Sequence, residues 1–470
     1  MDRPFLNRRH ILKTASAGFG YLAFAGLSTA AARDAETGPG KAGSSNPLAA
    51  KDPHFPARAK RVIFLCMQGG PSHVDTFDYK PELINGNGVS AKGNRKLLAP
   101  QWKFQQRGES GLWISDLFPH VAKHADDLCL IRSMHCDQPV HPRALTQMHT
   151  GNPQFVRPSL GAWALYGLGT ENQSMPGFIA LNPPNGSAQN IGSAFLPAVF
   201  QGTPLGRGSY RRPAMIRGRS EATPQLPDVG NDRLSQKAQR RQLDLIQSLN
   251  EEKLKREQNH AGVEGAIESL ELAFRMQDAM PELMDISNES QATLDMYGIE
   301  ASNTGSFGKQ CLLARRFVES GVRFVEVTHG NWDHHLRLSS ELPGNCEQVD
   351  KPIAGLLADL RQRGLLDDTL VIWGGEFGRT PDGQNGDGRD HNNKGYTLWM
   401  AGGGVKGGYS YGATDELGYE AVENKVHIHD WHATILHLLG LDHQKLTYRY
   451  AGRDFRLTDV YGNVIHDIVS

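Results

Sequence analysis

The densest group of chemically active side chains lies in one short segment, residues 328–335, which reads Thr-His-Gly-Asn-Trp-Asp-His-His. Three histidines and an aspartate therefore fall within one stretch that follows an apolar run. Imidazole and carboxylate groups together suit Zn, Mn, Fe or Ni, which accept nitrogen and oxygen ligands. A single histidine is usually structural, but this combination favours a metal-binding or catalytic role. The segment predicts a metal or catalytic site in this loop.

Two later segments carry groups of the same kind. Residues 374–380 read Gly-Gly-Glu-Phe-Gly-Arg-Thr. The glycines permit close backbone approach, Glu376 can serve as a ligand or general base, and Arg379 can clamp an anion. A salt bridge from Arg379 to Glu376 or Asp382 is the alternative reading. Residues 389–392, Arg-Asp-His-Asn, add His391 beside a carboxylate in a loop without apolar residues. A purely structural loop has little need for that composition.

These segments must be positioned by the elements that precede them. Apolar runs predict strands at 61–67, 128–131, 322–327, 369–373 and 396–401, and periodic patterns predict helices at 141–150, 307–320, 347–363 and 430–439. The alternation indicates an α/β fold with a mostly parallel central sheet flanked by helices. Polar residues just beyond the carboxyl ends of such strands form the site, so the segments above are expected to meet. The positive end of the helix that begins at His141 suits an anionic group.

Composition excludes several classes of protein. The chain has 470 residues, of which 39% are hydrophobic, enough for one large α/β domain with insertions or for two to three domains. Its 50 Lys and Arg against 51 Asp and Glu leave a net charge of -1, which excludes electrostatically driven nucleic-acid binding. Five cysteines exclude a disulfide scaffold, and their odd number leaves at least one unpaired.

The first residues resemble an export signal. Paired arginines, Arg8 and Arg9, precede a mildly apolar, Ala- and Gly-rich run that ends at Ala32. This arrangement predicts a cleavable twin-arginine signal over 1–32, with the twin-arginine export machinery as partner and a periplasmic or secreted destination. A membrane anchor is the alternative, although the run has low hydrophobicity. No later stretch is apolar enough to span a membrane, so no stable span is expected in the mature chain.

The remaining chain divides by composition. Residues 33–58 are rich in Gly, Ala, Ser and Pro and predict a disordered linker before a domain over 59–470. Within that domain, residues 183–230 are loop-rich, and the charged pattern from 232 to about 280 predicts helices with a solvated face. Together they predict a loop-rich and helical insertion over 183–285.

The body of the chain from about residue 61 resembles a large exported bacterial family known as a domain of unknown function, numbered fifteen hundred and one. Four phrases carry the resemblance: Gly-Gly-Pro-Ser-His-Val-Asp-Thr-Phe-Asp at 69–78, Trp-Asp-His-His at 332–335, Glu-Phe-Gly-Arg-Thr at 376–380 and Arg-Asp-His at 389–391. The ending at 452–460 is similar to its planctomycete-type branch. The resemblance implies the alkaline phosphatase and sulfatase superfamily and an alkaline-phosphatase-like fold.

The superfamily pattern fits this sequence only in part. Asp333, His335 and His391 resemble its Asp-His-His set for one divalent metal, whose identity stays open among Zn, Mn and Ca. Gln68 stands where the first strand normally ends in a metal-binding Asp, and Phe377 stands where a second metal has a His ligand. The nucleophile position, ten residues before Gly151, is His141. The resemblance therefore implies one metal site and a degraded second one.

Two functions follow from this pattern. The first is a metal-dependent hydrolase of phosphate or sulfate esters, in which Glu376 acts as base or orients a ligand and Arg379 clamps the anion. His141 would be the nucleophile or general acid, or else a histidine merely packed against its neighbours. The second is a non-catalytic metal-containing protein that binds an anionic glycan or a partner protein. A small anionic ester or a sulfated glycan is the expected ligand.

Overall fold

The computed structural model describes residues 46–91, 93–184, 188–206, 234–257 and 261–470. The predicted signal and the first part of the predicted linker lie outside these residues. Within them, no helix is long and apolar enough to cross a membrane.

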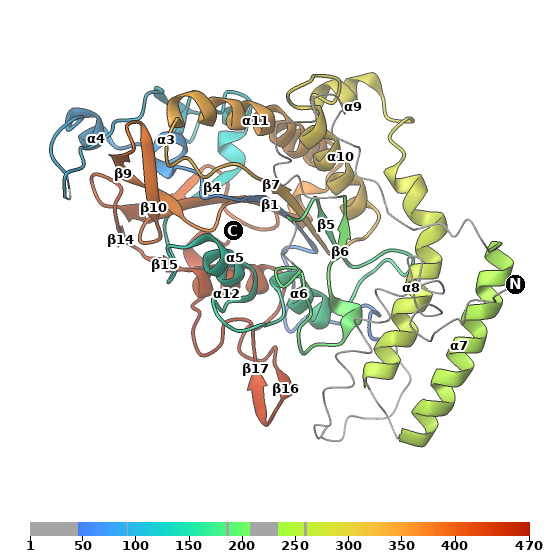
Figure 1. Cartoon of the computed structure of the whole chain (residues 1–470). Coiled ribbons are helices and arrows are strands. Elements are labelled where there is room, and N and C mark those ends of the chain that lie inside the picture. Colours follow the sequence, from blue (N-terminus) through green and yellow to red (C-terminus); the bar gives the residue numbers. More distant parts are fainter. Residues whose placement is uncertain (1–45, 92, 185–187, 207–233, 258–260) are drawn as a thin grey trace, which may run out of the picture.

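A central sheet organises the chain (Figure 1). Its strand order is β12-β4-β11-β8-β1-β7-β5-β6, with β15 beside β4. The strands β6, β5, β7, β1 and β8 are mutually parallel, whereas β11 runs against both β8 and β4. The bounds are β1 Arg61–Met67, β4 Leu128–His135, β5 Phe178–Leu181, β6 Thr203–Leu205, β7 Phe324–His329, β8 Thr369–Gly374, β11 Tyr396–Ala401, β12 Tyr409–Tyr411 and β15 Val426–His427. The predicted α/β class with a mostly parallel sheet is confirmed.

Helices cover both faces of this sheet (Figure 1). One face carries α10 (Gly305–Glu319) and α11 (Leu338–Gln362), and the other carries α5 (His141–Thr150), α6 (Leu160–Leu168) and α12 (Ile428–Leu438). Because both faces are covered, the central strands are apolar along their whole length rather than alternating. All of β8 and all but the first residue of β1 are buried. A buried carboxylate within β7, Glu326, departs from this pattern.

Short helices and two-stranded ribbons lie outside the central sheet. Short helices are α3 His73–Thr76, α4 Pro81–Asn85 and α9 Gln291–Met296, and the 3₁₀ turns are Val121–Asp127, Ala198–Phe200, Leu366–Asp368 and His466–Ile468. Four two-stranded ribbons pair β2 Phe104–Arg107 with β3 Leu112–Ser115, β9 Gly378–Gln384 with β10 Gly388–Asn392, β13 Ala413–Thr414 with β14 Ala421–Glu423, and β16 Tyr448–Tyr450 with β17 Arg453–Phe455. The β9–β10 ribbon carries residues of the candidate site.

The insertion contributes to the sheet as well as to the surface. Its long helices, α7 (Gln236–Glu257) and α8 (Ala261–Met284), lie beyond the β5–β6 edge (Figure 1). Arg240 of α7 binds Glu271 of α8 at 2.7 Å. The loop-rich part supplies β6, an edge strand that the sequence did not predict because it is only three residues long.

The described part of the predicted linker, residues 46–58, instead packs on the domain. Leu48 is 2% exposed, and the backbone N–H groups of Lys51 and Arg58 bond to carbonyls of Leu168 and Leu438. Composition missed this contact because it is made with helices far away in sequence. The five cysteines are all buried free thiols.

Candidate metal site

The six residues predicted to act at the site come together at the carboxyl edge of the sheet. Asp333 and His335 lie in the loop after β7, Glu376 follows β8, and Arg379 and His391 belong to β9 and β10. His141 is the first residue of α5. Because β7 and β8 flank β1 in parallel, their carboxyl ends open toward the same edge, as the sequence pattern predicted.

Four of these side chains offer their ligand atoms to one point. One atom each from His141, Asp333, His335 and His391 lies within 4.8 Å of the others. Asp333 Oδ1 is 3.3 Å from His141 Nε2, 3.0 Å from His335 Nε2 and 3.3 Å from His391 Nε2. The Nε2 atoms of His335 and His391 are 2.9 Å apart. Three imidazole nitrogens and a carboxylate oxygen form a donor set suited to Zn or Mn.

The opposite ring nitrogen of each histidine is held by another group. His141 Nδ1 lies 2.6 Å from Glu376 Oε1, His335 Nδ1 lies 2.5 Å from Gln384 Oε1, and His391 Nδ1 lies 2.6 Å from the Pro139 carbonyl. Each of these oxygens accepts a hydrogen bond from Nδ1, so a ring that gives up its second proton when a metal binds offers its Nε2 lone pair to that metal. Metal-bound histidines are oriented in this way. The donor set and the tautomers therefore fit a divalent metal.

Asp333 is fixed by an arginine as well as by the histidines. Arg379 Nη2 donates to Asp333 Oδ1 at 2.6 Å, and Arg379 Nε donates to the Gly70 carbonyl at 2.9 Å. Burial opposes ionisation, but hydrogen bonds from His141 and His391 and the Arg379 charge hold the pKa of Asp333 well below its ordinary value. The Arg379 side chain is 1% exposed and is directed at the protein's own groups. It holds the carboxylate and the turn after β1.

Glu376 lies behind His141, away from solvent. Its side chain is fully buried, and both carboxylate oxygens accept from the Gly69 backbone N–H at 3.1 Å. Burial would lower the pKa of His141, but hydrogen bonds to Asp333 and Glu376 raise that pKa to about 9. The Glu376 carboxylate thus orients His141 through its Nδ1 side.

The local backbone explains why glycines follow β1. Gly69 has φ +119°, and a Cβ there would lie 2.7 Å from the Asp333 backbone nitrogen. Gly70 has φ +75°, and a Cβ there would lie 2.7 Å from the Phe377 ring. Any larger residue would push the metal-ligand loop and the Phe377 ring outward.

A buried ion pair supports the β9–β10 ribbon. Arg389 Nε donates to Asp75 Oδ2 at 2.7 Å, and both side chains are fully buried. Arg389 also donates to the carbonyls of Pro381 and Leu98. This contact fixes the strand that presents His391. The sequence singled out both segments but gave no signal that Asp75 and Arg389 pair, or that Gln384 and Pro139 hold site histidines.

The other histidines of segment 328–335 stay out of the cluster. His329 Nδ1 accepts from Trp332 Nε1 at 3.0 Å, and His329 Nε2 faces Gln348 Oε1 at 3.2 Å. His334 is 2% exposed. Burial lowers the pKa of each to about 4, so both rings are neutral.

The position expected to hold a second metal ligand is apolar. Phe377 is 1% exposed, and its ring centroid lies 4.8 Å from that of His141 and 4.5 Å from that of His391. This ring forms one wall of the ligand cluster. Gln68, at the end of the first strand, adds an uncharged amide where a carboxylate would be needed.

Comparisons with known proteins give a family and distant structural likenesses. Residues 59–469 match the family described as "Protein of unknown function (DUF1501)". No protein with a curated description matches the sequence. The structure is similar to a sulfatase from Pseudoalteromonas sp. (14% identity, 90% of this chain and 72% of that chain, TM-score 0.35). It is also similar to a phosphonate monoester hydrolase from Silicibacter pomeroyi (11%, 81% and 73%, 0.35) and to a protein in the alkaline phosphatase superfamily from Vibrio parahaemolyticus (9%, 90% and 75%, 0.33).

Proposed function

The chain belongs to the DUF1501 family, and we propose that it is an exported, metal-dependent hydrolase of phosphate or sulfate esters. The observation that carries the proposal is the convergence of three Nε2 atoms on Asp333 Oδ1 while every Nδ1 is held elsewhere. The alkaline-phosphatase-like version of the fold, the twin-arginine signal and the planctomycete-type branch belong to the same proposal. They rest on the sequence motifs.

A divalent metal bound here would polarise an ester oxygen or lower the pKa of a bound water. The protein's own part is to fix the ligands. Glu376, Gln384 and the Pro139 carbonyl keep the three rings in one tautomer, and Arg379 keeps Asp333 ionised. Preorganisation of this kind lowers the cost of assembling the site for each turnover.

The proposal revises three roles. His141 becomes a fourth ligand, because its Nε2 faces Asp333 and its Nδ1 is committed to Glu376. Glu376 is an orienting group, because a fully buried carboxylate cannot exchange protons readily with water. Arg379 positions Asp333 and is not the group that binds the anionic substrate. With histidine at the nucleophile position, water is the attacking group, and the products are an alcohol and free phosphate or sulfate.

Solvent reaches the cluster from the Asp333 side. The Asp333 side chain is 44% exposed and that of His335 is 31% exposed, whereas Phe377 closes the opposite wall. A small anionic ester or the sulfate group of a glycan would approach from this open side.

A specific observation also favours the second function, a metal-containing binding protein without turnover. Four protein ligands fill a tetrahedral zinc centre, and filled centres are structural, whereas catalytic zinc keeps an open position. A metal that accepts more than four ligands would leave room for substrate on the open side. The identity of the bound metal therefore distinguishes the hydrolase from the binding protein.

The test uses the full chain loaded with Zn, Mn or Ca at matched stoichiometry. We expect about one equivalent at this site, hydrolysis of an aryl phosphate or aryl sulfate, and loss of both in His335→Ala. The exposed His466, changed to Ala, is the matched control and should retain both. Metal binding without hydrolysis of either ester would replace the enzyme with the binding protein. A folded chain that binds no metal and gains no thermal stability from any of the three would contradict both functions.

A further inference from the structure

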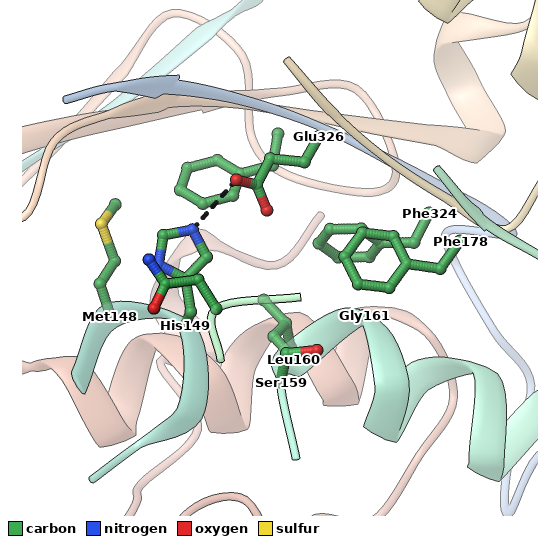
Figure 2. A pocket seen from close by; sticks show the side chains of 10 residues that line it. Met148, His149, Ser159, Leu160, Gly161, Phe178, Phe324 and Glu326 are labelled. Carbon is green, nitrogen blue, oxygen red and sulfur yellow. Dashed lines mark hydrogen bonds and ion pairs between the residues drawn. The ribbon is translucent and has the colours of Figure 1, made fainter. Parts of the chain in front are cut away.

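A second group of ligand-type side chains lies inside the domain, and two of its members, His149 and Glu326, lie between the sheet and the helices beneath it in Figure 2. Cys66 comes from β1, Glu326 from β7 and His149 from α5. All three are buried, with exposures of 1%, 3% and 4%. One ligand atom from each lies within 4.8 Å of the other two. A carboxylate in the middle of a parallel strand is costly unless something positive compensates it.

The hydrogen bonds leave the carboxylate with one long contact from a donor: Thr328 Oγ1 lies 3.4 Å from Glu326 Oε1. His149 Nδ1 lies 2.7 Å from the Leu145 carbonyl, which can only accept, so a neutral ring carries its proton on Nδ1. His149 Nε2 is then an acceptor, and it faces Glu326 Oε1, another acceptor, at 3.2 Å (Figure 2). Among the described residues Glu326 Oε2 has no hydrogen-bond partner.

Something positive must therefore sit between these acceptors. Water is a poor candidate, because the pocket that His149 and Glu326 line has no water-sized space. Among the described residues Glu326 forms an ion pair with His149 and with no Lys or Arg. A proton shared by His149 and Glu326, or a metal cation, remains.

We propose that Cys66, His149 and Glu326 bind a second divalent cation of the zinc type, separate from the Asp333 centre. Thiolate sulfur, imidazole nitrogen and carboxylate oxygen are the three zinc ligand types in proteins. Asn190 lines a pocket together with His149 and Glu326, and its Oδ1 has no partner among the described residues, which makes it the candidate for a fourth ligand. The cation would fasten β1 and β7 to α5, the helix that begins at His141.

Binding replaces protons with the cation. Burial, with the nearby Glu326 and Glu376 charges, raises the pKa of the Cys66 thiol well above its ordinary value, so the free protein holds the proton on sulfur. When the cation binds, the sulfur–hydrogen bond breaks, the electron pair stays on sulfur, and the proton leaves to solvent. Because the cluster is buried, the cation enters while the chain folds.

A sulfur-to-cobalt charge-transfer band reports on this centre alone, because the Asp333 centre contains no sulfur. The experiment is the near-ultraviolet absorption of the full chain produced in Co²⁺-supplemented medium, with total metal measured in parallel. We expect a sulfur-to-cobalt charge-transfer band in the wild type and in His335→Ala. Cys66→Ser should lose the band and about one equivalent of metal per chain. Cys346→Ser, which changes another fully buried thiol, should keep both.

The outcomes separate this proposal from the proposed function. Absence of the band from folded, cobalt-grown wild type would mean that a shared proton alone compensates Glu326, and the second cation would be rejected. A band that persists in Cys66→Ser would also reject it. Should Cys66→Ser fail to fold, the wild-type spectrum and the Cys346→Ser control still decide. If the wild type shows the band but hydrolyses neither ester, the result contradicts the function proposed for the Asp333 centre and leaves the second cation site standing.

Discussion

Changing Glu376 to Gln tests whether the hydrogen bond behind His141 tunes the metal centre. The carboxylate accepts from His141 Nδ1 at 2.6 Å and, through both oxygens, from the Gly69 N–H at 3.1 Å. Gln keeps the size but replaces one oxygen by an NH₂ group. That group then faces a donor, either the ring N–H of His141 or the backbone N–H of Gly69. His141 also loses the negative charge that makes its Nε2 a stronger ligand.

The magnitude follows from the type of contact. Loss of a partner that orients a metal-bound histidine weakens metal binding about 10- to 100-fold, or about 1.4–2.7 kcal/mol. We expect the Glu376→Gln chain to fall in that range, and the metal-free chain to stay folded because Gln fills the same volume. The measurement is competition for Zn²⁺ or Mn²⁺ against a chromophoric chelator at fixed pH.

The control removes the same charge elsewhere. Glu347 is an exposed carboxylate on α11, and Glu347→Gln should bind metal as the wild type does. If the metal affinity of Glu376→Gln is within a factor of about 3 of the wild type, the loss is smaller than an orienting partner of a metal ligand should cause. That result would refute the view that Glu376 supports a metal ligand. It would also refute the view that the three Nδ1 contacts together orient the histidines for a metal.

Three further predictions concern the support of the site, pH and export. Asp75→Asn leaves a buried arginine unpaired and should lower the free energy of urea unfolding by about 3–5 kcal/mol, whereas Glu420→Gln, in an exposed ion pair, should change it by at most about 1 kcal/mol. Burial lowers the pKa of His432 to about 3, so the unfolded chain binds the extra proton below about pH 6.5, and stability falls as pH drops toward 3. In urea titrations at several pH values, His432→Gln should reduce the change of unfolding free energy with pH by up to about 1.4 kcal/mol per pH unit. An unchanged pH dependence would contradict the prediction. Replacing Arg8 and Arg9 with Lys should abolish export while the chain still folds, and normal export on cell fractionation would remove the twin-arginine interpretation.

The position of the site was predictable because strand ends are predictable. The apolar runs that became β1 and β8 have sharp boundaries, and α5 spans the same residues in the sequence prediction and in the structure. Parallel strands bring their carboxyl ends together whatever the intervening sequence is. The meeting of segment 328–335 with Glu376 follows from that rule.

Boundaries were less predictable where local and long-range preferences disagree. The helix predicted from residue 347 begins at Leu338, because buried Leu338, Leu342 and Cys346 pack into the core and outweigh the local cost of Pro343. The β9–β10 ribbon is rich in glycine and polar residues and has no strand signal. It is held by the buried Arg389 guanidinium, whose partners lie far away in sequence. The partners of the ligand histidines were hidden for the same reason.

The wall formed by Phe377 bears most directly on what the site can do. A two-metal phosphatase needs a second cluster of charged ligands on that side, and here an aromatic ring contacts both His141 and His391. With Gln68 uncharged as well, the negative charge around the cluster is concentrated on Asp333, with Glu376 behind it. Arg379, 2.6 Å from Asp333 Oδ1, offsets one of these two charges, so the cluster has too little negative charge for two divalent ions. The proposed ester hydrolysis therefore uses one metal and water, with access from the exposed Asp333 side.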